Sequence, residues 1–98
     1  MNYNIKLHPE AEKAFKELDK SVQNIILKQF KKLTINPHIG QLLGNVKNLN
    51  LTGYYKLYAD NKKIRIVYKI ENDNLLVLIF GIGKRDNNKV YKNVYDRI

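Results

Sequence analysis

The feature that most constrains the fold is residues 75–83, a short segment that is apolar on both of its alternating faces. This pattern is typical of a central strand that is covered on both sides of a sheet. Residues 64–70 precede it and alternate cleanly between apolar and other side chains, which predicts a strand with one buried face. The Asn-Asp-Asn sequence at 72–74 predicts a turn between the two strands. The second half of the chain is therefore expected to form hairpin-linked strands.

The first half begins with a strand and continues with helices. Residues 3–7 alternate as a short strand, Pro9 suits the first turn of a helix, and Ser21 is the expected N-cap of a second helix. Both helices carry an apolar stripe at helical spacing: Ala11, Ala14, Phe15 and Leu18 in the first, and Val22, Ile25, Ile26, Phe30 and Leu33 in the second. Because the link between them is short, an antiparallel helical hairpin is predicted.

The remaining segments complete an α+β chain. Residues 34–50, with Asn36-Pro37, Gly40 and Gly44, predict a loop, residues 54–58 a strand, and residues 88–98 a short C-terminal helix or an extended tail. This order predicts an N-terminal strand and a helical hairpin packed on one face of a mainly antiparallel, four-stranded curved sheet. The other face is expected to be free for binding. Residues 1–98 are expected to form a single domain.

The charge distribution points to a polyanionic partner. Lysine and arginine number 18 against 9 acidic residues, and residues 20–59 contain six lysines and no acidic residue. Such a field attracts phosphate backbones, and the resulting binding should weaken with salt. A lysine-rich composition without function is the alternative interpretation. An anionic membrane surface is disfavoured, because no basic amphipathic helix with aromatic anchors is present.

Several classes of chemistry lack the residues that they need. The chain has no cysteine, which excludes disulfides and thiolate chemistry and suits a reducing cytosol. No signal peptide is expected at the N-terminus, and no apolar run approaches the ~20 residues of a membrane span, so a cytoplasmic protein is expected. Zinc-ligand spacing and a P-loop are missing, so no metal or cofactor is expected. His8 is expected to help to begin the first helix, and His38 to be solvated.

Basic and tyrosine side chains in the second half form the candidate site. Alternation places Tyr54, Lys56 and Tyr58 on one face of their strand, and it places Arg65 opposite the apolar row of the next strand. Gly83-Lys84-Arg85 follows where the chain leaves the sheet. One concave surface is therefore expected to gather Lys56, Tyr58, Arg65, Arg85 and Tyr91. Taken one by one, these residues are equally typical of a solvated sheet face.

This collection suits RNA cleavage. A ribonuclease must deprotonate a 2′-hydroxyl, stabilise the charged phosphorane and protonate the leaving 5′-oxygen. Neighbouring positive charges lower the pKa of a lysine, so that some neutral amine can act as a base. Arginines hold and stabilise the phosphate charge, and a tyrosine can stack on a base or donate to the phosphate.

The same residues carry a resemblance to a known family. The segments concerned are Tyr55-Lys56-Leu57, Ile64-Arg65-Ile66-Val67-Tyr68, Gly83-Lys84-Arg85 and Val90-Tyr91. Their types and spacing, with nine residues from Lys56 to Arg65 and six from Arg85 to Tyr91, resemble successive motifs of the RelE family of the RelE/ParE toxin superfamily.

The resemblance implies a metal-independent endoribonuclease that cleaves mRNA in the ribosomal decoding site. Under it, Lys56 belongs to the active patch, Arg65 stabilises the transition state, Arg85 binds phosphate and is a possible proton donor, and Tyr91 stacks on the substrate. Lys84 and Lys89 are expected RNA contacts. In well-studied members a second lysine, two residues after the first, is the proposed general base. This chain has Tyr58 there, so the base is left open among Lys56, Tyr58, Lys62 and Lys63.

The resemblance also implies partners and leaves alternatives. A toxin needs a cognate antitoxin, and we expect an acidic, partly helical segment that wraps the basic surface in a hetero-oligomer. Ribosome and mRNA are the other expected partners, with operator DNA contacted only through the antitoxin. The alternatives are a ParE-like inhibitor of DNA gyrase and an inactive toxin fold that only binds antitoxin or nucleic acid.

Overall fold

The computed structural model describes residues 2–85 and 88–98 of the chain. In this part the helices are α1 (Pro9–Lys16), α2 (Lys20–Ile35) and α3 (Lys89–Arg97), with a 3-10 turn, η1 (Pro37–Ile39). The strands are β1 (Asn4–Leu7), β2 (Gln41–Leu42), β3 (Asn45–Val46), β4 (Leu49–Asn50), β5 (Tyr54–Ala59), β6 (Ile64–Glu71) and β7 (Leu76–Lys84). The predicted order of strand, two helices, strands and a C-terminal helix is confirmed, and the C-terminal segment is a helix.

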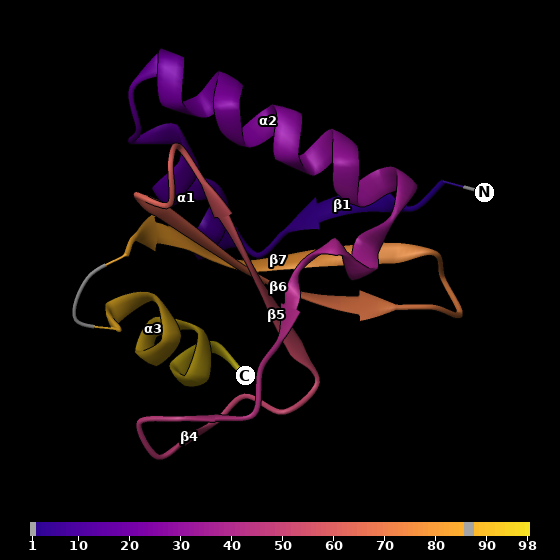
Figure 1. The fold of residues 1–98 in the computed structure, drawn as a ribbon, viewed down its shortest axis with the longest axis vertical. Coiled ribbons are helices and arrows are strands. Elements are labelled where there is room, and N and C mark those ends of the chain that lie inside the picture. Colours follow the sequence, from indigo (N-terminus) through magenta and orange to yellow (C-terminus); the bar gives the residue numbers. More distant parts are fainter. Residues whose placement is uncertain (1, 86–87) are drawn as a thin grey trace.

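The main sheet has five strands in the order β1-β7-β6-β5-β2, with β1 parallel to β7 and the other pairs antiparallel (Figure 1). The α+β class is confirmed, but the sheet contains one strand more than expected. Strand β2 comes from residues 34–50, which were predicted to be a loop and also contain η1 and the β3–β4 hairpin. Two-residue strands are too short to show a period of two, so the pattern could not reveal them.

Helices α1 and α2 cover one face of the sheet, as predicted. Their apolar stripes pack with the alternating residues of β6 and β7 in one core, which contains Ala11, Ile26, Phe30, Leu33, Ile64, Ile66, Tyr68, Val77, Ile79 and Ile82. His8 begins α1, where its Nδ1 accepts a hydrogen bond from the Glu10 amide at 3.1 Å. The N-cap of α2 is Asp19 and not Ser21, because the helix already begins at Lys20.

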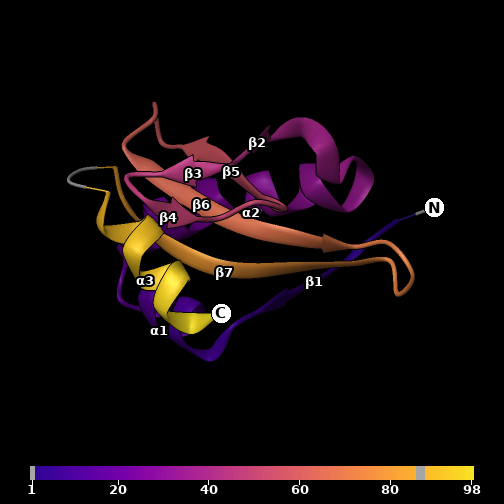
Figure 2. The same ribbon diagram turned by 90° about the horizontal axis from the view of Figure 1, so that it is seen from below.

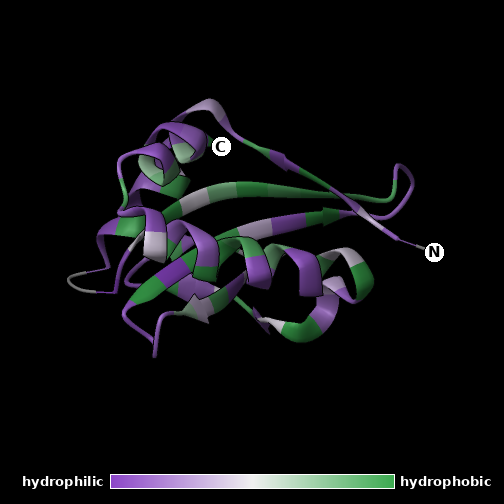
Figure 3. Cartoon of the chain, turned by 90° about the horizontal axis from the view of Figure 1, so that it is seen from above, coloured by the Kyte–Doolittle hydropathy of each residue, from purple (hydrophilic) through white to green (hydrophobic). Residues whose placement is uncertain are grey.

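The opposite face is not free, which corrects the expectation from sequence. Helix α3 packs on β7 and contributes Val90, Tyr91 and Val94 to a second core with Tyr54 and Val67. The view from above has α2 in front of the sheet (Figure 3), whereas α3 is in front in the view from below (Figure 2). The two helical layers thus lie on opposite sides of the sheet.

Two glycines of β7 allow α3 to pack closely against this strand. A Cβ atom at Gly81 would lie 2.5 Å from a methyl group of Val94, and one at Gly83 would lie 2.7 Å from Val90. A bulge of β7 lies beside Gly81, and the carbonyl of the neighbouring Phe80 accepts a 2.6 Å hydrogen bond from Arg97 Nη1. Glycine inside a strand often marks such a close approach. In the described part of the chain, no helix is long and apolar enough to cross a membrane.

Candidate active site

Tyr58 lies at the centre of a basic cluster on the α3 side of the sheet. Strand pairing places it directly opposite Arg65 of β6, and Lys56 lies two residues earlier on the same face of β5. Lys56 Nζ donates a 3.1 Å hydrogen bond to Tyr58 Oη. The guanidinium carbons of Arg65 and Arg85 lie 5.7 and 5.4 Å from the centroid of the Tyr58 ring. We call Lys56, Tyr58, Arg65, Arg85 and Tyr91 the basic cluster; the structure brings all five together.

Arg65 is buried, although an open face was expected. Its residue exposure is 7%, and its Cζ lies 4.3 Å from the centroid of the Tyr91 ring. Its Nε and Nη1 atoms are inaccessible and have no hydrogen-bond acceptor among residues 2–85 and 88–98. Buried nitrogens that lack acceptors cost free energy, which stacking of the guanidinium on an aromatic ring offsets only in part. Within the described ranges, the hydrogen-bonding capacity of these two nitrogens is therefore unmet.

Tyr91 occupies its position because α3 packs on the glycines of β7. The residue is 3% exposed, and its ring is covered between the helix and Arg65. In this arrangement the ring supports the guanidinium of Arg65. Stacking on a substrate base, which the sequence resemblance implied, would first require the ring to become accessible.

The surrounding cations make Tyr58 an unusually acidic tyrosine. The hydrogen bond from Lys56, and then the neighbouring Arg65 guanidinium, lower the pKa of Tyr58 from 10.0 to about 8. Both effects favour the phenolate over the neutral phenol. Tyr68, on the helix-covered face, behaves in the opposite way, because burial raises the pKa of its hydroxyl to about 12. The two tyrosines differ because their strand positions face opposite sides of the sheet.

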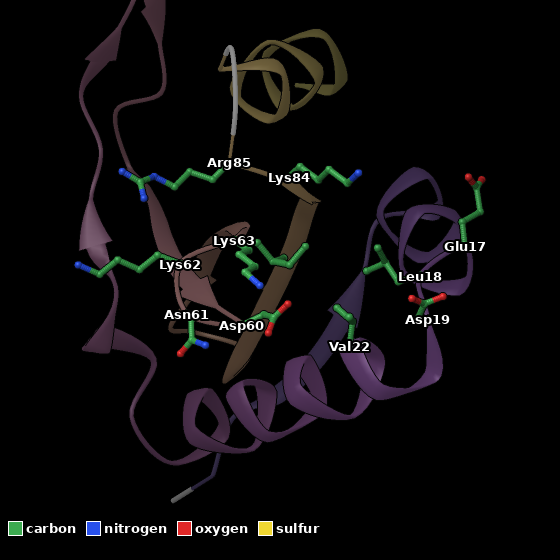
Figure 4. A pocket seen from close by; sticks show the side chains of 11 residues that line it. Glu17, Leu18, Asp19, Val22, Asp60, Asn61, Lys62, Lys63, Lys84 and Arg85 are labelled. Atoms are coloured by element: carbon green, nitrogen blue, oxygen red, sulfur yellow. The ribbon is translucent and has the colours of Figure 1, made fainter.

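Arg85 links the basic cluster to a neighbouring cleft of about 630 Å³. Its backbone amide donates a 3.0 Å hydrogen bond to the Lys63 carbonyl in the turn between β5 and β6. Figure 4 shows the side chains of Lys62 and Arg85 extending to the same side, whereas Lys84 extends the other way, toward α1. Both lysines line the cleft, with Lys62 on the side of Arg85 and Lys84 on the side of α1.

Lys89 does not join the cluster. It is the first residue of α3 and is exposed, and no contact with the cluster is found in the described ranges 2–85 and 88–98. The sequence pattern did not reveal the residues that position α3 on the sheet, namely Gly81, Gly83 and Arg97. Two glycines in an otherwise apolar strand were the available signal for this packing. Residues 2–85 and 88–98 contain no group of three His, Asp or Glu side chains placed to hold a metal ion.

Comparison with known proteins identifies the family. Residues 5–89 match the family model described as the ParE toxin of the type II toxin–antitoxin system parDE. A putative RelE-like toxin protein of Escherichia coli is 30% identical to this chain, over 100% of the chain and 99% of that protein.

Solved structures share the fold. A double mutant of the E. coli toxin RelE in the free state matches with a TM-score of 0.82 and 23% identity, covering 100% of this chain and 99% of that one. A chain of the intact E. coli RelBE toxin–antitoxin complex matches with a TM-score of 0.73 and 21% identity, covering 87% and 99%. The family match, the RelE-like relative and the shared fold agree, and the chain therefore belongs to the RelE/ParE toxins of type II toxin–antitoxin systems.

Proposed function

We propose that this toxin is a ribosome-dependent endoribonuclease that cleaves mRNA in the decoding site and so inhibits translation in the cytoplasm. The observation that carries the proposal is the buried Arg65 cation, whose Nε and Nη1 have no acceptor among the described residues. Once the covering Tyr91 ring moves aside and these atoms become accessible, a phosphate oxyanion supplies the missing acceptors, and its charge grows in the transition state of phosphodiester cleavage. The site is thus suited to bind the transition state more tightly than the ground state.

The neighbouring residues suit the remaining tasks. Arg85 is exposed beside Tyr58 and provides a second guanidinium for the phosphate. Lys56 adds a positive charge, and the Tyr91 ring stacks on the guanidinium of Arg65. The proton acceptor belongs to the set Lys56, Tyr58, Lys62 and Lys63. Under this proposal Lys84 and Lys89 contact RNA outside the catalytic centre, and no metal takes part.

The test uses purified toxin, programmed ribosomes and end-labelled mRNA, with and without ribosomes. We expect cuts in the decoding site only when ribosomes are present. Arg65→Ala and Arg85→Ala should each lower the cleavage rate at least tenfold, which corresponds to about 1.4 kcal/mol. Lys13→Ala removes one positive charge from the exposed surface of α1 and should leave the rate unchanged. Intact mRNA in the presence of ribosomes would refute the proposal.

The match to the ParE family model favours a second candidate, inhibition of DNA gyrase. This activity rests on protein–protein binding and gives no role to a buried arginine whose Nε and Nη1 lack acceptors among the described residues. A supercoiling assay with gyrase distinguishes the two: blocked supercoiling with intact mRNA would support the gyrase inhibitor. If neither activity is found, the chain is a toxin fold that only binds antitoxin or nucleic acid.

We also propose that an acidic, partly helical antitoxin segment wraps the basic surface in a hetero-oligomer, and that operator DNA is contacted only through the antitoxin. Complexes of fold relatives with antitoxins, such as the E. coli RelBE complex, support a partner of this kind. With a net charge of +9 on the toxin, raising NaCl from about 50 to 500 mM should increase the Kd at least about tenfold. A Kd that does not change with salt would contradict the electrostatic part of this proposal.

A further inference from the structure

The ribonuclease proposal leaves open which group removes the proton from the 2′-hydroxyl, and the geometry of the basic cluster points to one. We propose that Tyr58, hydrogen-bonded to Lys56 and flanked by Arg65 and Arg85, is the catalytic proton acceptor. This inference rests on the proposed ribonuclease function and deepens it.

The contacts of Tyr58 separate it from the other candidates. It is the residue that Lys56, Arg65 and Arg85 all face, with its ring centroid 5.0 Å from Lys56 Nζ and 5.7 and 5.4 Å from the two guanidinium carbons. A phosphate held by the two arginines would therefore lie close to the side chain of Tyr58. Lys62 and Lys63 are solvent-exposed turn residues, and in the part of the chain that is described no such side-chain contact holds either of them at the phosphate position.

Lys56 acts as a hydrogen-bond donor to Tyr58. Its Nζ donates to Tyr58 Oη at 3.1 Å, and an ammonium group has no lone pair with which to accept a proton. The bond stabilises the phenolate, because a hydrogen bond from a cation favours the charged form of its acceptor. Lys56 thus acts as a positioning residue that prepares Tyr58, and Tyr58 is the group that accepts the proton.

The acidity of Tyr58 suits the task. With a pKa of about 8, roughly one molecule in ten carries the phenolate near pH 7, against about one in a thousand for an unperturbed tyrosine. A general base works best when its pKa is near the operating pH, since it is then both available and basic enough.

The chemical step balances without a metal or cofactor. The Tyr58 phenolate takes the proton of the 2′-hydroxyl, the 2′-oxygen forms a bond to phosphorus, and the bond from phosphorus to the 5′-oxygen breaks. The leaving 5′-oxygen takes a proton from water, and Tyr58 later releases its proton to solvent. The products are a 2′,3′-cyclic phosphate and a 5′-hydroxyl end.

The experiment measures single-turnover cleavage of ribosome-bound mRNA as a function of pH. The wild-type rate should rise about tenfold per pH unit and level off near pH 8. Tyr58→Phe should lower the rate at least about 100-fold, whereas Tyr95→Phe, at an exposed tyrosine of α3 outside the cluster, should change neither rate nor profile. Lys56→Met should move the inflection to higher pH, and a fluorinated tyrosine at position 58, whose phenol is more acidic, should move it to lower pH.

The outcomes distinguish the two proposals. Rapid wild-type cleavage with a Tyr58→Phe rate equal to wild type, or with an inflection that the fluorinated tyrosine does not move, would overturn the assignment of Tyr58 alone. Wild-type protein that leaves ribosome-bound mRNA intact would overturn the ribonuclease function, and the base assignment would fall with it. The fluorinated protein keeps the native ring and its hydroxyl, so this arm remains decisive if Tyr58→Phe does not fold.

Discussion

Replacing Arg65 by methionine should make the toxin more stable while it removes a residue that we place in the active site. Two guanidinium nitrogens of Arg65 are buried without an acceptor in the described residues, and each such atom costs about 2 kcal/mol. Stacking on Tyr91, with Cζ 4.3 Å from the ring centroid, recovers about 2 kcal/mol. Methionine is of similar length and needs no hydrogen bonds. The difference is a net stabilisation of about 2 kcal/mol for the variant, within the range seen when buried charges are replaced.

Urea denaturation of the isolated toxin measures this difference. With a dependence on urea of about 1–2 kcal/mol/M, typical of small proteins, the midpoint of Arg65→Met should rise by roughly 1–2 M. The matched control is Arg85→Met, which removes an exposed guanidinium of the same cluster and should stay within about 0.5 kcal/mol of wild type. A midpoint that falls for Arg65→Met while the control is unchanged would refute the reasoning. The buried guanidinium would then stabilise the fold without an anion, and its assignment to phosphate binding would lose its basis.

Three further predictions concern the packing and titration of the sheet. In urea denaturation, Gly81→Ala should lower the free energy of unfolding by about 1–3 kcal/mol, because the new methyl group would overlap Val94. The control Gly44→Ala places its methyl group in open space and should leave the free energy of unfolding nearly unchanged. Equal effects of the two substitutions would contradict the close packing of α3 on β7. Tyr68→Phe should lower the free energy of unfolding by about 1–3 kcal/mol, because the Tyr68 hydroxyl donates to one backbone carbonyl and accepts from one backbone amide. An unchanged free energy of unfolding would mean that water replaces these bonds. The pKa of Tyr58 is lowered to about 8 in the folded protein. The free energy of unfolding of wild type should therefore rise relative to that of Tyr58→Phe as the pH increases from about 8 to 10, whereas below pH 8 the difference between the two proteins should not change with pH. Parallel urea midpoints for the two proteins across this range would show that the hydroxyl is not acidified.

Much of the fold follows from patterns that are local in sequence. The alternation in residues 54–58 and 64–70 predicted which side chains share a face, and the structure confirms that Lys56, Tyr58 and Arg65 lie together, opposite Tyr68. The helical stripes predicted the layer that covers the other face. The role of His8 at the start of α1 was also correct.

The site was only partly predictable. Pattern and resemblance selected the five residues of the basic cluster, but they left Arg65 on an open surface and left the proton acceptor undecided. The buried position of Arg65 depends on α3, which returns to the sheet from the end of the chain. The pKa of Tyr58 depends on cations contributed by two different strands. Neither property has a local signature in the sequence.

Residues 75–83, which are apolar on both faces of their strand, show which properties follow from the sequence and which need the tertiary structure. Their composition determined that both faces of the strand would be covered, because apolar side chains on both sides of a strand need a cover that excludes water. Which element supplies the second cover was decided only by tertiary packing, in which Gly81 and Gly83 let α3 approach and enclose Arg65 beneath Tyr91. The physical reason is that the face of a residue follows from backbone geometry over a few positions. Its neighbours across that face depend instead on strand register and on contacts between distant segments.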